Sequence, residues 1–444
     1  MLYKLFKWLF YFTTKAYFRS LYIQGKHLVP KKGPVLFVAN HSSAFMDPIL
    51  LAVHIQRSLY FLARGDVFKN KIASALFNKL HMIPVYKPDV SPDDMHKNEA
   101  VFEKCYEHLE NQKTILLFPE GVSKTERRLR KIKTGVARIA LEAEHKNNFE
   151  LKTTIVPIGI NYSNTHHFKS DVFVNFGPPI DVNSFQESYL NNPKEGVLEL
   201  TNAVKEALEG RMVIVEDDRL DKIIKQIEIL YRSKLRDENS QRDKAPQDFY
   251  LSKDIVKAVS YFSKTDPKKL ATFETKITQY LAHLKKLKIR DTQVRSSKTK
   301  LNLLSRMLYF IIGFPSFMLG YLTNIIPYKL TAFLSSKILV RKDFIGSLKL
   351  ALGMFIFLFI YLIEASLFGA YTSTIWGVIF FVFLYPFGLF TINYRKEYYL
   401  TRGNLKYLLL FMRKGTIIDE LKSTRAALVA ELEESKETYL KTIA

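Results

Sequence analysis

The sequence is nearly without cysteine: among its 444 residues only Cys105 carries a thiol. A single thiol excludes an internal disulfide and leaves no cysteine cluster that could hold a metal. The adjacent His166 and His167 have no third convergent ligand that the sequence reveals, so we predict no metal site. We interpret Cys105 as a small buried apolar residue.

Acidic residues are few compared with basic ones, 43 against 66, which gives a net charge of +23. A charge of this size attracts polyanions, and the two obvious candidates are nucleic acid and the anionic headgroups of lipids. No zinc module or RNA-stacking motif is visible, and much of the basic excess flanks long apolar segments. We therefore expect an anionic membrane surface as a partner, and no nucleic acid.

Charged residues are almost absent from three long segments: residues 307–327 and 374–394 contain none, and residues 350–370 contain only Glu364. Each segment reaches the length of about 20 apolar residues that a bilayer crossing needs. Only three residues separate the second segment from the third, which predicts a membrane hairpin. Basic residues flank both of its ends, and such flanks stay in the cytoplasm.

The first apolar segment, 307–327, has basic residues on both sides, so a single crossing would leave one basic flank outside the cytoplasm. Its sequence also contains Gly313, Pro315, Gly320 and Pro327, which disfavour a straight helix. We predict a re-entrant or broken hairpin here, and a single crossing is the alternative.

Residues 1–24 lack the features of a signal peptide, because Lys7 interrupts the apolar run and no small-residue cleavage site follows. Aromatic and basic residues alternate along this segment, which predicts an amphipathic helix that lies in a membrane interface. An ordinary helix packed on the neighbouring domain is the alternative.

Residues 25–215 have the pattern of an α/β domain. Apolar, β-branched runs predict strands at 35–39, 59–63, 115–118, 154–160 and 172–176, and helical patterns such as 98–110 lie between them. We predict a central mixed sheet, mostly parallel and flanked by helices. Residues 216–300 form a charged helical region, residues 301–394 carry the membrane segments, and residues 395–444 form a helical tail.

The first strand-like run ends in Asn40-His41, and Asp47 follows six residues after the histidine. A free imidazole has a pKa of about 6.5 and accepts a proton near neutral pH, and a carboxylate can orient it. The pair alone is a weak signal, because most neighbouring histidines and aspartates are structural.

Three further features point to the same edge of the sheet. The turn Glu120-Gly121 follows another strand, and its backbone N–H groups can face a ligand. A basic loop then leads to a helix that begins near residue 134, and cations beside a helix N-terminus suit a phosphate. Arg64 ends the strand 59–63, and parallel strands deliver their carboxyl ends to one edge.

Four blocks, "NHSSAFMDP", "LARGDVF", "LFPEGVS…KIKTGVA" and "IVPIGINY", resemble the glycerophosphate acyltransferase family in order and spacing. The resemblance covers residues 25–215. Two departures from the commonest pattern favour the glycerol-3-phosphate and dihydroxyacetone-phosphate acyltransferase branch with carboxyl-terminal membrane segments. Five residues rather than four separate His41 from Asp47, and no Thr-Arg follows Gly121.

The resemblance implies roles for individual residues. His41 would be the general base and Asp47 would hold its imidazole. The substrate-binding residues would be Arg64, Glu120, Gly121, Ser123, Lys133 and, near the acyl donor, Pro157.

The resemblance also implies the reaction. A fatty acyl group would pass from a thioester, acyl-CoA or acyl-ACP, to a hydroxyl of glycerol-3-phosphate or a related glycerophosphate, without a further cofactor. The domain would lie on the cytoplasmic face of a membrane. The alternatives are a 1-acylglycerol-3-phosphate (lysophosphatidate) acyltransferase and a non-catalytic lipid-binding protein on the same fold.

Overall fold

The computed structural model describes residues 1–87, 90, 92–238, 244–295, 303–338, 341–413 and 415–443. The chain divides into two compact units. The first unit consists of Met1–Ile214 together with Ser335–Met354, and the second consists of Val215–Leu334 together with Phe355–Ala444.

The first unit is built on a mixed sheet whose strands follow the order β1-β7-β6-β2-β5-β3-β4, with β8 paired to β6. The central strand β2 is parallel to β5 and β6, whereas β7 and β8 run antiparallel to β6. The predicted mixed α/β sheet is thus confirmed. The strands are β1 (Ser20–Gln24), β2 (Val35–Ala39), β3 (Leu59–Arg64), β4 (Met82–Val85), β5 (Thr114–Leu117), β6 (Thr154–Tyr162), β7 (Asp171–Phe176) and β8 (Ile180–Asp181).

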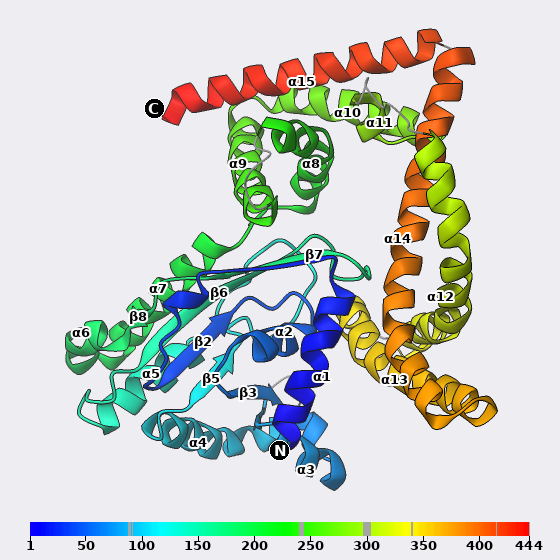
Figure 1. Ribbon diagram of the computed structural model, residues 1–444. Coiled ribbons are helices and arrows are strands. Elements are labelled where there is room, and N and C mark those ends of the chain that lie inside the picture. Colours follow the sequence, from blue (N-terminus) through cyan, green and yellow to red (C-terminus); the bar gives the residue numbers. More distant parts are fainter. Residues whose placement is uncertain are drawn as a thin grey trace. The chain divides into compact units, whose positions relative to one another are not determined.

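Helices cover both faces of this sheet (Figure 1). Because successive side chains of a strand point to opposite faces, Leu36 and Val38 pack with one group of helices while Phe37 packs with the other. The first group is α4 (Asn98–Glu110), α5 (Gly135–Lys146) and α7 (Pro193–Arg211), and the second is α1 (Leu2–Tyr17) and α2 (Met46–His54). The short α3 (Lys71–Lys79) and α6 (Gln186–Asn191) complete the helices of this part of the chain.

The amino-terminal helix is shorter than expected and packs on the domain. Helix α1 ends at Tyr17, and Ser20–Gln24 form the edge strand β1 instead of a last helical turn. Lys7 donates from Nζ to the carbonyl of Ile55, 2.6 Å away, and so caps the carboxyl end of α2. Three large apolar side chains of α1 are exposed: Leu5, Trp8 and Phe12. That this helix lies in a membrane interface stays a prediction.

Outside the long apolar helices, the second unit is a helical bundle. It contains α8 (Asp218–Glu238), α9 (Lys244–Thr265), α10 (Pro267–Leu287), α11 (Asp291–Arg295) and α15 (Gly415–Ile443). Ile418 and Leu421 of α15 are buried in the same apolar cluster as Ile277 and Tyr280 of α10. The carboxyl-terminal tail therefore packs on the charged helical region, which the sequence pattern alone did not indicate.

Within the described ranges, three helices are long and apolar enough to cross a membrane: α12 (Leu303–Lys337), α13 (Ile345–Tyr371) and α14 (Thr374–Arg413). The expected break within 307–327 is not present, since α12 continues through Pro315 and Pro327. A Cβ on Gly320 would collide with the Phe387 carbonyl and the Thr391 hydroxyl of α14. The glycine permits close helix packing, as small residues do in membranes, rather than ending the helix.

Candidate active site

The carboxyl end of β2 is locked to β6 by the side chain of Asn40. Its Nδ2 donates to the carbonyl of Ile160 at 3.0 Å, and its Oδ1 accepts from the N–H of Ile160 at 2.7 Å. This amide therefore extends the ladder between β2 and β6 by one polar residue. The residue that follows, His41, leaves the sheet at a fixed position.

His41 and Asp47 meet as predicted. Nδ1 of His41 lies 2.9 Å from Oδ2 of Asp47. An ionised carboxylate only accepts hydrogen bonds, so Nδ1 carries the proton and Nε2 is left as the basic nitrogen. The Asp47 side chain is fully buried, whereas the His41 side chain keeps 17% of its surface exposed. The imidazole stacks on Phe118, with ring centroids 4.1 Å apart.

Two further groups hold the carboxylate of Asp47. The N–H of Ser43 donates to Oδ2 at 2.8 Å, and the hydroxyl of Tyr162 donates to Oδ1 at 2.7 Å. Burial and the neighbouring carboxylate raise the pKa of Tyr162 well above its usual value, so its hydroxyl stays a donor. Sequence reasoning missed Tyr162, because only the pairing of β6 with β2 brings the end of β6 to Asp47.

Glu120 is a buried carboxylate that joins two loops. It accepts from the N–H of His41 at 2.8 Å and from the N–H of Arg130 at 3.2 Å. Burial raises the pKa of Glu120, and these two backbone donors act against the shift. The carboxylate thus fixes the backbone at His41; that it also binds a substrate hydroxyl stays a prediction.

The turn after Glu120 is tight and lies beside a lysine. Gly121 has a φ of +70°, a region that disfavours side chains. Cε and Nζ of Lys133 lie 3.2 Å from the place where a Cβ would be. Lys87, two residues after β4, donates to the carbonyl of Gly121. Gly121 and Lys133 are therefore neighbours; that each binds substrate stays a prediction.

The other three residues predicted to bind substrate are Ser123, Arg64 and Pro157, and they lie in different parts of the first unit. The hydroxyl of Ser123 donates to the carboxylate of Asp343. Arg64 ends β3 and pairs with Asp66 at 3.0 and 2.7 Å, and β5 separates its strand from β2. Pro157 is buried in β6 opposite Val38, away from the strand end. The substrate-binding roles of Arg64 and Pro157 remain predictions.

Cys105 is confirmed as a buried apolar residue, and its burial raises the pKa of the thiol to about 12. A thiol with this pKa is not ionised near neutral pH and is a poor nucleophile. Among the described residues, no cluster of three or more histidine, cysteine, aspartate or glutamate side chains could hold a metal ion.

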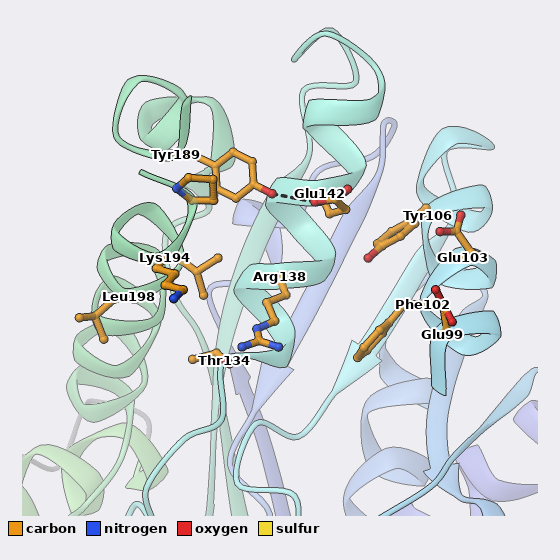
Figure 2. A pocket seen from close by; sticks show the side chains of 12 residues that line it. Glu99, Phe102, Glu103, Tyr106, Thr134, Arg138, Glu142, Tyr189, Lys194 and Leu198 are labelled. Atoms are coloured by element: carbon orange, nitrogen blue, oxygen red, sulfur yellow. Dashed lines mark hydrogen bonds between the residues drawn. The ribbon is translucent and has the colours of Figure 1, made fainter. Parts of the chain in front are cut away.

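A separate cavity of about 610 Å³ lies between α4, α5 and α7 (Figure 2). Aromatic rings of Phe102, Tyr106 and Tyr189 line it together with charged side chains. The hydroxyl of Tyr189 donates to Glu142 at 2.7 Å, as the dashed line in Figure 2 shows. Neither His41 nor Asp47 lines this cavity.

The site has the parts of a transferase that activates an alcohol: a supported His–Asp pair, a Pro-Glu-Gly turn bonded to it, and basic side chains nearby. Residues 20–161 match the family model described as Acyltransferase, and this part of the chain is an acyltransferase domain.

Curated relatives are named as acyltransferases of glycerol-3-phosphate. The chain is 24% identical over 385 residues to glycerol-3-phosphate O-acyltransferase 1 of Saccharomyces cerevisiae, covering 67% of this chain and 50% of the relative. It is 32% identical over 112 residues to glycerol-3-phosphate O-acyltransferase 2 of the same yeast, covering 25% of this chain and 15% of the relative. The chain thus spans half or less of these two relatives.

Among solved structures, the 1-acyl-sn-glycerophosphate acyltransferase of Thermotoga maritima aligns with 47% of this chain and 77% of its own, at 20% identity. The TM-score is 0.35.

Proposed function

We propose that this protein is a membrane-bound O-acyltransferase that moves a fatty acyl group from a thioester donor to a hydroxyl of glycerol-3-phosphate. The observation that carries the proposal is the His41–Asp47 pair, 2.9 Å apart and supported by Tyr162. It lies in a domain whose relatives are named for this reaction. The donor is an acyl-CoA or an acyl-ACP.

The geometry supports a one-step transfer. Nε2 of His41 removes the proton of the acceptor hydroxyl as the oxygen attacks the thioester carbonyl, and Asp47 stabilises the imidazolium that forms. The new C–O ester bond forms, the C–S bond breaks, and the proton passes from the imidazolium to the departing thiolate. No acyl-enzyme is needed, which agrees with the burial of Cys105.

The acceptor's phosphate needs cations close to this base. The loop that follows Gly121 supplies several, and Lys133 lies against Gly121. Glu120 holds the backbone of both His41 and Arg130, so the turn fixes the base relative to the basic loop. In the proposed enzyme, Arg64, Ser123 and Lys133 contribute to acceptor binding and Pro157 lies toward the donor.

A membrane location suits this reaction because its product is a lipid. Helices α12, α13 and α14 have the length and composition for membrane insertion. The basic flanks of α13 and α14 favour the cytoplasmic face for the catalytic domain, and a net charge of +23 favours an anionic lipid surface.

The test is acyl transfer by the full chain in vesicles with one labelled acyl thioester. His41→Ala should lower kcat by at least about a hundredfold, because a general base contributes on the order of 10²–10⁴. Asp47→Asn should also lower it severely. Equal product from wild type and His41→Ala would refute the catalytic role. A panel of glycerol-3-phosphate, dihydroxyacetone phosphate and lysophosphatidate as acceptors would separate the proposed activity from the lysophosphatidate alternative.

A further inference from the structure

A short segment between two apolar helices belongs to the first unit. Residues 341–350, here called the strap, begin between α12 and α13 and end in the first turns of α13. Asp343, Ser347 and Leu350 are buried in that unit, and Leu350 joins the apolar cluster around α2. Gly346 lies against the carbonyl of Thr165 so closely that a Cβ would collide with it. The strap is therefore closely packed against the rest of the first unit.

The strap bonds to the loop that carries the base. Ser347 Oγ donates to the carbonyl of Ser43 at 3.1 Å and accepts from the N–H of Met46 at 3.0 Å. Ser43 in turn donates its N–H to Asp47. Through these bonds the strap fixes the backbone between His41 and its carboxylate partner.

The strap also bonds to the loop after the Pro-Glu-Gly turn. The guanidinium of Arg341 donates to the carbonyl of Ser123 at 3.0 Å and to the carboxylate of Asp343 at 3.1 and 2.9 Å. Asp343 accepts from the hydroxyl of Ser123. These contacts use Nε and Nη2 of Arg341 and leave its Nη1 hydrogens available to a ligand.

Between the strap and this loop lies a pocket of about 440 Å³. Its lining residues come from three segments: Val122, Ser123, Lys124, Thr125, Arg130, His166, Arg341, Lys342 and Asp343. Four of them are lysine or arginine and one is a carboxylate. The N–H of Lys124 donates to the carbonyl of His41 at 3.0 Å, and the hydroxyl of Thr125 donates to the carbonyl of Ser42 at 3.1 Å. The pocket wall is thus bonded directly to the catalytic loop.

We propose that this pocket binds a phosphate monoester, and that Arg341 and Lys342 of the strap are binding residues for it together with Lys124 and Arg130. The inference rests on the proposed function, for which the phosphate is that of the acceptor; the headgroup of a phosphatidate lipid presents the same chemistry. Both strap residues lie far outside residues 20–161, the part that matches the family model.

The composition of the pocket suits a dianion. The carboxylate of Asp343 accepts hydrogen bonds from Arg341 and Ser123. Its negative charge therefore offsets part of the positive charge of Arg341, and its repulsion of an anionic ligand is reduced. Glu126, which pairs with Arg130 at 2.7 Å and with Lys124 at 3.5 Å, does not line the pocket. The exposed side chain of Lys342 makes no ion pair or hydrogen bond with any residue that the structure describes, so its positive charge is available to a ligand.

The test uses the full chain in nanodiscs of phosphatidylcholine, with equilibrium binding of labelled glycerol-3-phosphate and steady-state acyl transfer measured separately. Lys342→Gln should raise both the Kd and the KM of glycerol-3-phosphate about tenfold, because the loss of one hydrogen bond to a charged group weakens binding by about this factor. The kcat and the donor KM should change less than about twofold. Lys342→Arg, which keeps the charge, should restore most of the affinity.

The matched control is Lys396→Gln, which removes an exposed cation from the flank of a membrane helix outside the pocket. It should leave Kd and KM unchanged, and an equal loss in this control would mean that general surface charge, not the pocket, attracts the ligand. A second arm uses nanodiscs with phosphatidate and measures its competition with glycerol-3-phosphate. Loss of competition in Lys342→Gln with an unchanged Kd for the soluble ligand would assign the phosphate to a lipid headgroup.

If neither arm changes in Lys342→Gln, the inference is overturned while measured acyl transfer still supports the proposed function. If the wild type binds glycerol-3-phosphate in the pocket but transfers no acyl group to it, the proposed function fails and the binding site stands.

Discussion

At the scale of single residues, the catalytic proposal depends on how Asp47 is held. Its carboxylate is fully buried and has three hydrogen-bond donors, from His41, Ser43 and Tyr162. An ionised carboxylate in such a place is stable only when its oxygens are satisfied. The donor from Tyr162 is the one that can be removed with the smallest change of shape.

Tyr162→Phe should lower kcat about tenfold and leave the KM of both substrates nearly unchanged. The loss of one charge-assisted hydrogen bond costs about 1.5–3 kcal/mol, and part of this cost appears when Asp47 must stabilise the imidazolium. Steady-state kinetics of the full chain in vesicles would measure it. Tyr106→Phe, a buried tyrosine of the separate cavity, is the control. A kcat equal to wild type in Tyr162→Phe would show that the hydroxyl does not support catalysis.

The sequence predicted the His41–Asp47 pair because both residues are local to one strand end and one helix start. It could not reveal Tyr162 or Ser347 as their supports, since these lie 115 residues from Asp47 and 304 from Ser43 along the chain. The motif around Glu120 predicted that this residue binds substrate. In the structure, both of its carboxylate oxygens accept hydrogen bonds from backbone N–H groups. A motif identifies residues that matter more readily than it identifies their partners.

At the scale of elements, α2 connects the site to the amino-terminal helix. Its first turn contains Asp47, and its last residue is His54. Burial lowers the pKa of His54 to about 4, with Lys26, Lys15 and Lys7 acting in the same direction. The imidazole packs near the ring of Tyr11, 5.6 Å between centroids, and its Nε2 has no hydrogen-bond partner. His54 is therefore held neutral in the folded protein.

Acid should destabilise the first unit through this histidine. The folded pKa lies below the unfolded value of about 6.5, so the contribution of His54 to stability is present above about pH 6.5 and is lost as the pH falls toward 4. The loss amounts to at most about 3 kcal/mol. Thermal unfolding of the full chain in detergent between pH 7 and 4 would measure it. His54→Gln should flatten the pH dependence, and the exposed His27→Gln should not; identical slopes in all three proteins would refute the assignment.

The prediction of helices and strands succeeded where a local sequence pattern determines the element. It failed where contacts with distant parts of the chain determine it. The run 35–39 and the helix 98–110 were recognisable from alternation and a helix start, and both occur as β2 and α4. The strand β1 was missed because its sequence continues the aromatic and basic character of α1, and its pairing with β7 forms across 150 residues. Glycines in 307–327 suggested a break, but Gly320 is a contact point for α14.

At the scale of the whole molecule, connectivity constrains the membrane topology. No helix long and apolar enough to cross a membrane lies between β1 and α12 among the described residues. In a membrane, the start of α12 would therefore lie on the same side as the sheet of the first unit. Its other end leads into the strap, which is buried in the first unit. If these helices insert into a membrane, both ends of α12 belong on one side. The contacts of α15 with α10 then allow α13 and α14 to cross only as a pair that returns to that side.

We therefore predict that α12 dips into the bilayer or lies along its surface without crossing once, and that the loop between α13 and α14 is the part exposed on the far side. Single cysteines in a Cys105→Ser chain, labelled with a membrane-impermeant maleimide in sealed vesicles of known orientation, would measure this. Lys337→Cys should react from the same side as Glu150→Cys on the surface of the first unit, and Thr372→Cys from the opposite side. Reaction of Lys337→Cys together with Thr372→Cys would instead establish a single crossing by α12, and the strap could then not be seated in the unit that holds His41.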